Sequence, residues 1–268
     1  VPAPKDDLAQ FLLVATRGHC PGRETLQRGS LKSMDFAAST WTSAPNMSAP
    51  RAHGKFAAAV GDTVYAFGGW TCNASLPHDG YLSAVEFLAP GATSWAAAPS
   101  MHWPRAQFGA TVLDGRIYVA GGKTDAPVNG SAFLKQLDIY DPVQKAWELA
   151  PTPPHFARTY AAVGSLDGLV YVAGGIARVT CVGSSLPSEC ILSSVESYNP
   201  ATKQWAIEPN MPYNVSLASA HGAAGKLFVV GGLRAGAVDP TSQSQRPVGT
   251  VQIFDAKTRV WSLGPLLP

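Results

Sequence analysis

The sequence has 268 residues with 20 Lys and Arg against 18 Asp and Glu, so its formal net charge is +2, and charged residues make up only 14% of it. No basic run is present, which argues against a nucleic-acid partner, and no apolar stretch approaches the roughly 18 residues that a membrane helix needs. No linker divides the chain, so we expect one domain over residues 1–268.

The predicted elements begin with a shortened unit in residues 1–41. Its strand signals are Phe11 to Thr16 and Leu31 to Phe36, and Trp41 marks a further strand. Where later units have a full inner strand, this unit has only Lys5 to Ala9.

Four complete units follow, at residues 51–95, 105–147, 158–205 and 216–261. In each unit we expect two strands joined by a tight turn, a glycine pair, a long polar loop, and two more strands joined by a short turn. The first turns carry hairpin chemistry, as at Asp114-Gly115 and Asp167-Gly168, and long loops in compact domains are usually functional. Up-and-down strand order places all the long loops and unit-to-unit connections on one face, which we call the loop face, and leaves the opposite face flat.

Glycine pairs and tryptophans recur in step along these units. A glycine pair allows positive φ and a close approach of the backbone, and tryptophan supplies buried area between sheets, so we read both sets as structural. The residues are Gly68, Gly69, Gly121, Gly122, Gly174, Gly175, Gly231 and Gly232, with Trp41, Trp95, Trp147, Trp205 and Trp261.

The repeat period of about 50 residues is typical of a propeller. The apolar run into Gly-Gly, the spaced aromatic residues, and the arginines before the first strands, Arg51, Arg105 and Arg158, resemble the kelch repeat. The resemblance implies an all-β propeller of four-stranded antiparallel blades with five repeats. The five blades would span approximately residues 1–45, 46–100, 101–150, 151–209 and 210–268. Closure at five blades and membership of a longer propeller are both compatible with the sequence.

Four Asn-x-Ser triplets predict N-linked glycans at Asn46, Asn73, Asn129 and Asn214. The strand order places all four on the loop face. The alternative is chance occurrence in serine-rich loops.

The four cysteines lie in predicted loops, which fits an oxidising compartment. Cys181 and Cys190 share one loop and are close enough in sequence to bridge. Cys20 and Cys72 occupy nearly equivalent places in adjacent units, and they could pair if their loops lean together. The alternative is four free thiols in the cytosol.

No residue pattern predicts a catalytic, metal or cofactor site. His19, His78, His102 and His155 could converge on the loop face, but the sequence has no Cys-x-x-Cys pair, Ser-His-Asp neighbourhood or glycine-rich phosphate loop. The tyrosine, histidine and cysteine cluster of galactose-oxidase-like proteins and the iron-binding run of plant nitrile-specifier proteins are absent as well.

We therefore expect a non-catalytic interaction or structural platform, namely a secreted or cell-surface glycoprotein module of a larger protein or assembly. Its protein partners would bind the loop face or the flat opposite face. The alternatives are a galactose-oxidase-like metalloenzyme and a cytoplasmic kelch adaptor that presents substrates to a ubiquitin ligase. Such adaptors resemble this chain and line their pocket with arginines and serines, for which Arg17, Arg51, Arg105, Arg158 and Arg178 are candidates here.

Overall fold

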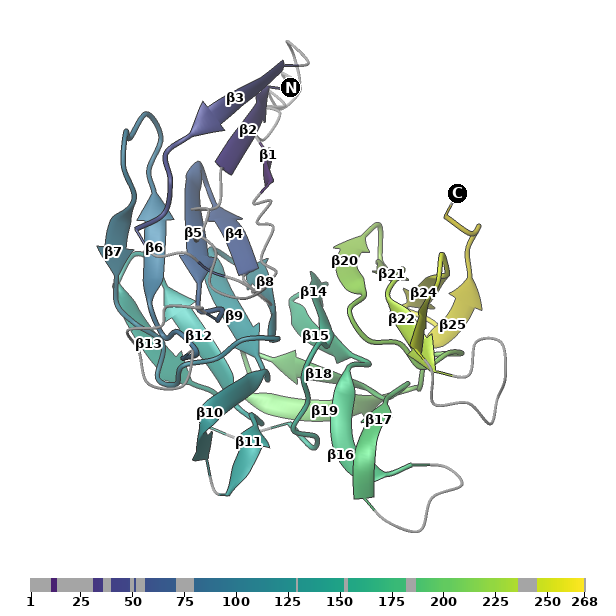
Figure 1. Cartoon of the computed structure of the whole chain (residues 1–268). Helices are drawn as coiled ribbons and strands as arrows, with labels where there is room; N and C mark the ends of the chain where they lie inside the picture. The colour runs from purple at the N-terminus through teal and green to yellow at the C-terminus, as the bar shows by residue number, and fades with distance from the viewer. Residues whose placement is uncertain are drawn as a thin grey trace.

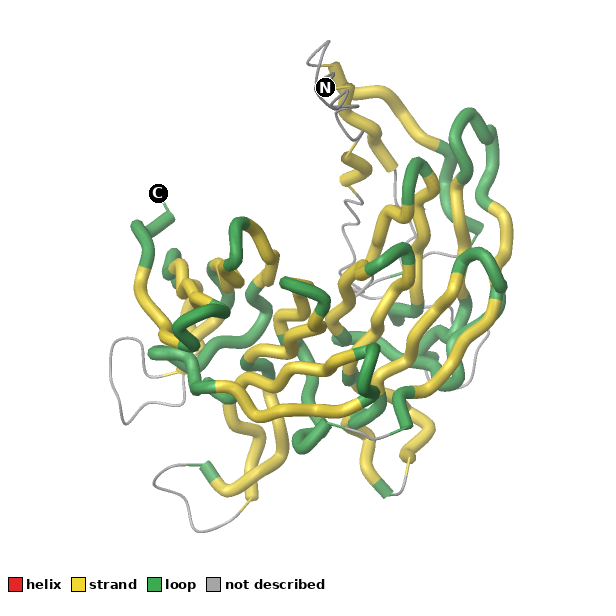
Figure 2. Tube along the Cα trace, turned by 180° about the vertical axis from the view of Figure 1, so that it is seen from behind, coloured by secondary structure: helices red, strands yellow, loops and turns green. Residues whose placement is uncertain are grey.

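The computed structural model describes residues 11–13, 31–35, 40–48, 51, 56–70, 80–128, 130–151, 154–181, 187–235 and 245–267. Within these ranges there is no helix, and Figure 2 shows strands joined by turns and loops along the described chain. The all-β prediction is confirmed. No described segment forms a helix that could cross a membrane.

Among the described residues, five antiparallel sheets of three or four strands follow one another along an arc (Figure 1). The first sheet is β1 (Phe11–Leu13), β2 (Leu31–Asp35) and β3 (Thr40–Ala44). From the inner to the outer strand, the second is β4 (Phe56–Val60), β5 (Thr63–Phe67), β6 (Val85–Leu88) and β7 (Ala96–Ala98), and the third is β8 (Gly109–Leu113), β9 (Arg116–Ala120), β12 (Leu137–Asp141) and β13 (Ala146–Leu149). The fourth is β14 (Ala162–Leu166), β15 (Leu169–Ala173), β18 (Val195–Asn199) and β19 (Gln204–Glu208), and the fifth is β20 (Ser219–Ala223), β21 (Lys226–Val230), β24 (Val251–Asp255) and β25 (Val260–Leu263).

The inner strands of neighbouring sheets lie against one another. Strand β14 contacts both β8 and β20, and β8 also contacts β4, so these four strands surround the axis of the arc. In Figures 1 and 2 the arc has an open side between the first sheet and the fifth. In the shortened first unit, residues 1–10 lie outside the described residues.

The segments after three of the glycine pairs form two-stranded ribbons where the sequence indicated long loops. They are β10 (Lys123–Val128) with β11 (Ser131–Phe133), β16 (Ile176–Thr180) with β17 (Pro187–Ile191), and β22 (Leu233–Ala235) with β23 (Gln245–Pro247). Pairing the two arms of each segment provides partners for backbone N–H and C=O groups that would otherwise need water. The β10–β11 and β16–β17 ribbons lie at the lower edge of the molecule in Figure 1, and β22 lies at the right beside β24.

The opposite face carries short turns, as the sequence predicted. The Asp141 side chain accepts hydrogen bonds from the backbone N–H groups of Val143 and Gln144 at 2.9 and 3.0 Å. Asn199 does the same for Ala201 and Thr202. Side-chain caps of this kind favour tight turns, because they replace hydrogen bonds that the strand ladder no longer supplies.

The hydrophobic core lies between neighbouring sheets rather than at one centre. Because successive side chains of a strand point to opposite faces, each second strand fills two interfaces. In β15, Val170 and Val172 pack toward the third sheet, and Tyr171 and Ala173 pack toward the fifth. Both faces of the strand are therefore apolar and buried.

The repeated tryptophans fasten the outer strand of one sheet to the sheet before it. Trp147 packs against Tyr140 with the rings tilted and their centroids 4.9 Å apart, and its Nε1 donates to the carbonyl of Pro99 at 2.7 Å. Trp95 and Trp261 make the same bond to Pro45 and Pro209. Each ring thus supplies buried area and still satisfies its single donor.

The glycine pairs have the left-handed backbone that their residue type permits. All eight glycines have positive φ, and Gly122 at +103° shows why no side chain fits. A Cβ there would lie 2.8 Å from the carbonyl oxygen of Ala106. The Gly122 N–H donates to the carbonyl of Arg158 in the next unit, so the close approach links two sheets.

Candidate binding site at the channel mouth

The inner strands line an open cavity of about 480 Å³, which we call the central channel. Many of the residues of β4, β8, β14 and β20 that line it are small, and Thr111, Ser165 and His221 add polar groups. Glycine, alanine and serine occur here because the inner strands converge and leave little room for larger side chains.

Three equivalent residues stand where the chain enters the inner strands, at the loop-face end of the channel. Gln107, Tyr160 and Leu217 have φ values of 60°, 54° and 58°, a conformation that costs an L-residue roughly 1 kcal/mol or more. The Tyr160 N–H donates to the Gln107 carbonyl at 2.6 Å, and the Leu217 N–H donates to the Tyr160 carbonyl at 3.0 Å. We call these three residues the channel-mouth ring.

The ring presents both polar and apolar groups. Leu217 is 51% exposed, while Gln107 and Tyr160 are half-buried. Burial raises the pKa of the Tyr160 phenol, the Gln107 side chain lowers it through a hydrogen bond, and the charge of Glu189 raises it further. Burial likewise raises the pKa of Tyr81, with additions from Asp125 and Tyr160. Both phenols are therefore neutral hydrogen-bonding groups at physiological pH.

Buried ion pairs hold the chain segments that lead into the inner strands. Arg105 Nη2 lies 2.6 Å from Asp138 Oδ2, and neither side chain is exposed. Arg105 also donates to the carbonyl of Gly121, so it ties the connection before β8 to the ends of β9 and β12. The pairs of Arg51 with Glu86 and of Arg158 with Glu196 repeat this arrangement at 2.7 and 2.5 Å.

These contacts correct one expectation. Arg51, Arg105 and Arg158 were candidates for lining a pocket, but each guanidinium is buried and held by a carboxylate and a carbonyl. A buried charge is tolerated only with such partners, so these arginines are structural. Arg178 is exposed on the β16–β17 ribbon opposite Glu189, and Arg17 lies outside the described residues.

Burial and pairing have opposing effects on the carboxylates. Burial raises the pKa of Asp138, and the nearby charges of Arg105 and His102 only partly offset this. For Glu86, burial raises the pKa, but hydrogen bonds from Ser48 and Arg51 outweigh it and hold the pKa below its ordinary value.

The fifth sheet replaces the ion pair by neutral residues. Val215 stands at the arginine position and Gln252 at the carboxylate position, and both are buried. Gln252 Oε1 accepts from the Tyr213 N–H at 2.8 Å, and its Nε2 donates to the Tyr213 carbonyl at 3.2 Å. The amide thus holds the same connection without a charge.

His102 and His155, two of the four histidines considered as metal ligands, lie in different units and each contacts a carboxylate. His155 Nδ1 is 2.8 Å from Glu196, and His102 Nδ1 is 3.4 Å from Asp138, each within its own unit. Among the described residues no three His, Cys, Asp or Glu side chains gather as a metal site. His19 and His78 lie outside the described residues.

The predicted glycosylation residues are only partly described. Asn46 is exposed in the connection before the second sheet. Asn214 is half-buried, and Ser216 of the same triplet has no exposed surface. Asn73 and Asn129 lie outside the described residues.

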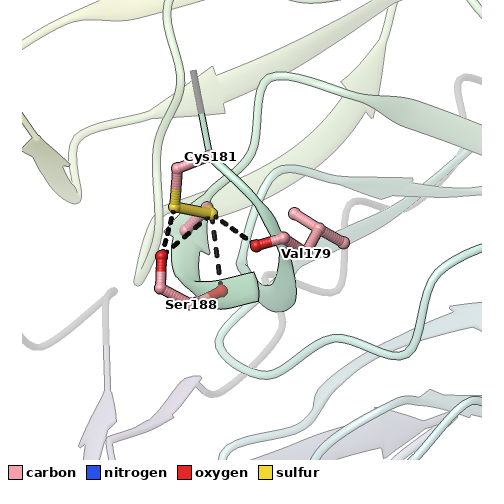
Figure 3. The surroundings of a disulfide bond; sticks show 4 residues. Val179, Cys181 and Ser188 are labelled. Atoms are coloured by element: carbon pink, nitrogen blue, oxygen red, sulfur yellow. Dashed lines mark hydrogen bonds between the residues drawn. A yellow bond between two sulfur atoms is a disulfide. The ribbon is translucent and has the colours of Figure 1, made fainter. Parts of the chain in front are cut away.

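Cys181 and Cys190 form a disulfide that joins the arms of the β16–β17 ribbon (Figure 3). Their Cα atoms are 5.6 Å apart. Ser188 Oγ lies 2.8 Å from Cys181 Sγ, and it is the donor because a disulfide sulfur carries no proton. Cys20 and Cys72 lie outside the described residues.

Sequence reasoning missed the carboxylates and the channel-mouth ring. A signal for the carboxylates was present, because Glu86, Asp138 and Glu196 each follow the first apolar residue of a third strand, where the last unit has Gln252. The ring had no such signal. Glutamine, tyrosine and leucine have no chemical group or shape in common, and they share only their backbone conformation.

Radial four-stranded sheets with glycine pairs, buried arginines and a central channel define a β-propeller. The Kelch motif matches residues 104–154 and 157–212. The chain is 27% identical to an F-box/kelch-repeat protein of Arabidopsis thaliana over 175 residues, 65% of this chain and 38% of that protein. It is 31% identical to Kelch-like protein 25 of Xenopus tropicalis over 160 residues, 60% of this chain and 25% of that protein.

The solved structure of YjhT superposes with a TM-score of 0.71 and 17% identity, over 89% of this chain and 78% of that one, which shows the same fold. The matched repeats and these relatives show that the chain is similar to kelch-repeat proteins. It spans less than two fifths of the length of the two curated relatives described above.

Proposed function

We propose that the chain is a protein-interaction module whose partner binds the loop face at the channel-mouth ring. The observation that carries this is that Gln107, Tyr160 and Leu217, which share a left-handed backbone, all line the cavity between the inner strands, where Leu217 is exposed. Strain at non-glycine residues persists where the surrounding structure holds it, and such residues cluster at functional sites. Similarity to kelch-repeat proteins supports a binding role over a catalytic one.

Glycine substitution tests the ring without harming the fold. Glycine adopts positive φ freely, so the triple variant Gln107→Gly, Tyr160→Gly and Leu217→Gly removes three side chains while relieving strain. We expect the variant to keep the wild-type melting temperature within a few degrees. It should fail to capture partner proteins that the wild type recovers from an extract of the expressing cells, as quantified by mass spectrometry.

The opposite face supplies a matched control. Lys145, Lys203 and Arg259 also have positive φ, at 52°, 58° and 57°, in the turns of that face. Their triple glycine variant should recover the same proteins as the wild type. Partners that survive the ring variant, or that disappear with the opposite-face variant, would contradict the proposed site.

We further propose that the protein is an N-glycosylated, extracellular or cell-surface module. The Cys181–Cys190 disulfide and the exposure of Asn46 support this, since disulfides persist in oxidising compartments. Enzymatic deglycosylation of native protein should lower its mass, and Asn46→Gln should lower it by one glycan. An unchanged mass, or free thiols at Cys181 and Cys190 in native protein, would reject this proposal.

The second candidate is the cytoplasmic adaptor for a ubiquitin ligase. Similarity to an F-box/kelch-repeat protein and to Kelch-like protein 25 favours it. Free thiols and an unglycosylated chain in native material would select this candidate, and both candidates use the same binding face.

A further inference from the structure

The β22–β23 ribbon carries two arginines directly opposite each other. Arg234 pairs with Arg246 in the antiparallel register, so both side chains lie on the same face of the ribbon. Like charges directly opposite each other destabilise a pair of strands. An anion bound between the two guanidinium groups would remove this repulsion. No carboxylate of the described residues forms an ion pair with either arginine.

Arg234 is held in place by an aromatic platform. Its guanidinium carbon lies 3.9 Å from the centroid of the Tyr213 ring, a close cation–π contact. The Tyr213 backbone is clamped on both sides by Gln252, which is only 1% exposed. The Nε atom of Arg234 is buried and has no hydrogen-bond partner.

Comparison with the preceding units shows that this arrangement belongs to the last one. Trp103 and Phe156 occupy the position of Tyr213, and there the aromatic ring faces the buried arginine of the ion pair, at 5.9 and 5.3 Å. In the last unit that arginine is replaced by Val215, and the ring instead holds Arg234 of the ribbon. In the last unit the aromatic ring therefore faces an arginine of the ribbon rather than the arginine of a buried ion pair.

We propose that Arg234 and Arg246 form an anion-binding site that takes the carboxylates of an acidic segment of a partner protein. Guanidinium groups bind carboxylates through paired hydrogen bonds, and a guanidinium fixed on an aromatic ring loses less side-chain freedom on binding. The inference rests on the proposed function, because it assigns a chemistry to the partner that reaches the loop face.

The test uses the full chain and a labelled hexaglutamate peptide at low ionic strength, followed by fluorescence anisotropy. We expect Arg234→Gln and Arg246→Gln each to weaken binding about tenfold, the size of a lost charge-assisted pair. The matched control is Arg178→Gln, which removes the same charge from the neighbouring β16–β17 ribbon, where Glu189 stands opposite. This variant should bind within about twofold of the wild type, and hexaglutamine should not bind.

Three results would overturn the site. The first is that the wild type and both ribbon variants bind hexaglutamate with equal affinity. The second is that Arg178→Gln weakens binding as much as the ribbon variants do, which would indicate unspecific charge attraction. The third is that the wild type does not bind hexaglutamate even at low salt. Tyr213→Leu adds an independent readout, because it leaves the charges in place and should still weaken binding. If partner capture depends on the channel-mouth ring while both ribbon variants capture normally, only the anion site fails.

Discussion

The buried pair of Arg105 and Asp138 gives a quantitative test of how the units are held together. In the variant Arg105→Val, the Asp138 carboxylate stays buried and loses its 2.6 Å ion pair with Arg105. Only the contact with His102 at 3.4 Å is left. Removing one partner of a buried ion pair costs about 3–5 kcal/mol. Because the pKa of Asp138 is already raised by burial, the carboxyl can take up a proton, so we expect about 3 kcal/mol.

The fifth sheet shows how the loss can be repaired. Val215 and Gln252 fill the same two positions there, so Arg105→Val combined with Asp138→Gln should lie within about 1 kcal/mol of the wild type. Urea unfolding followed by tryptophan fluorescence measures both variants, and the single variant should shift the midpoint by about 1 M.

An exposed arginine serves as the control. Arg116 is 39% exposed in its ion pair with Asp141, so Arg116→Val should cost less than about 1 kcal/mol. A single variant Arg105→Val as stable as the wild type, or a double variant no more stable than the single one, would refute the reasoning.

Three further predictions concern pH, backbone conformation and the disulfide. In the folded protein the pKa of Glu86 lies below its ordinary value of 4.5. The stabilisation from the Glu86 carboxylate is therefore present above pH 4.5 and is lost as the pH falls through the folded pKa. Glu86→Gln should show a flatter loss of stability below about pH 4.5 in denaturant titrations. Gly122→Ala should lower the free energy of unfolding by more than about 2 kcal/mol, because of the positive φ and the 2.8 Å approach to the Ala106 carbonyl oxygen. Gly115→Ala has open space around it and should lower it by about 1 kcal/mol. Equal melting temperatures of the two variants would contradict this. Cys190→Ser opens a closed segment of ten residues and should destabilise the β16–β17 ribbon by about 2–3 kcal/mol, seen as faster amide exchange in that ribbon with little change at the inner strands.

The sequence by itself determined the repeat and the kind of sheet. Gly-Gly, tryptophan and alternating apolar residues are local requirements of a strand that ends in a close backbone approach, so their period can be read without coordinates. The short turns at Asp141 and Asn199 are likewise set by residues within four positions of each other.

Only the tertiary structure decided which arginines are available and which residues form the binding surface. The sequence indicates no partner for either Arg105 or Arg234, yet one meets a carboxylate 33 positions away and the other an aromatic ring of a neighbouring connection. The channel-mouth ring depends on backbone bonds between successive sheets, from Tyr160 to Gln107 and from Leu217 to Tyr160. Such partners are distant in the chain, and their meeting is fixed by how the sheets pack around the channel rather than by any local pattern.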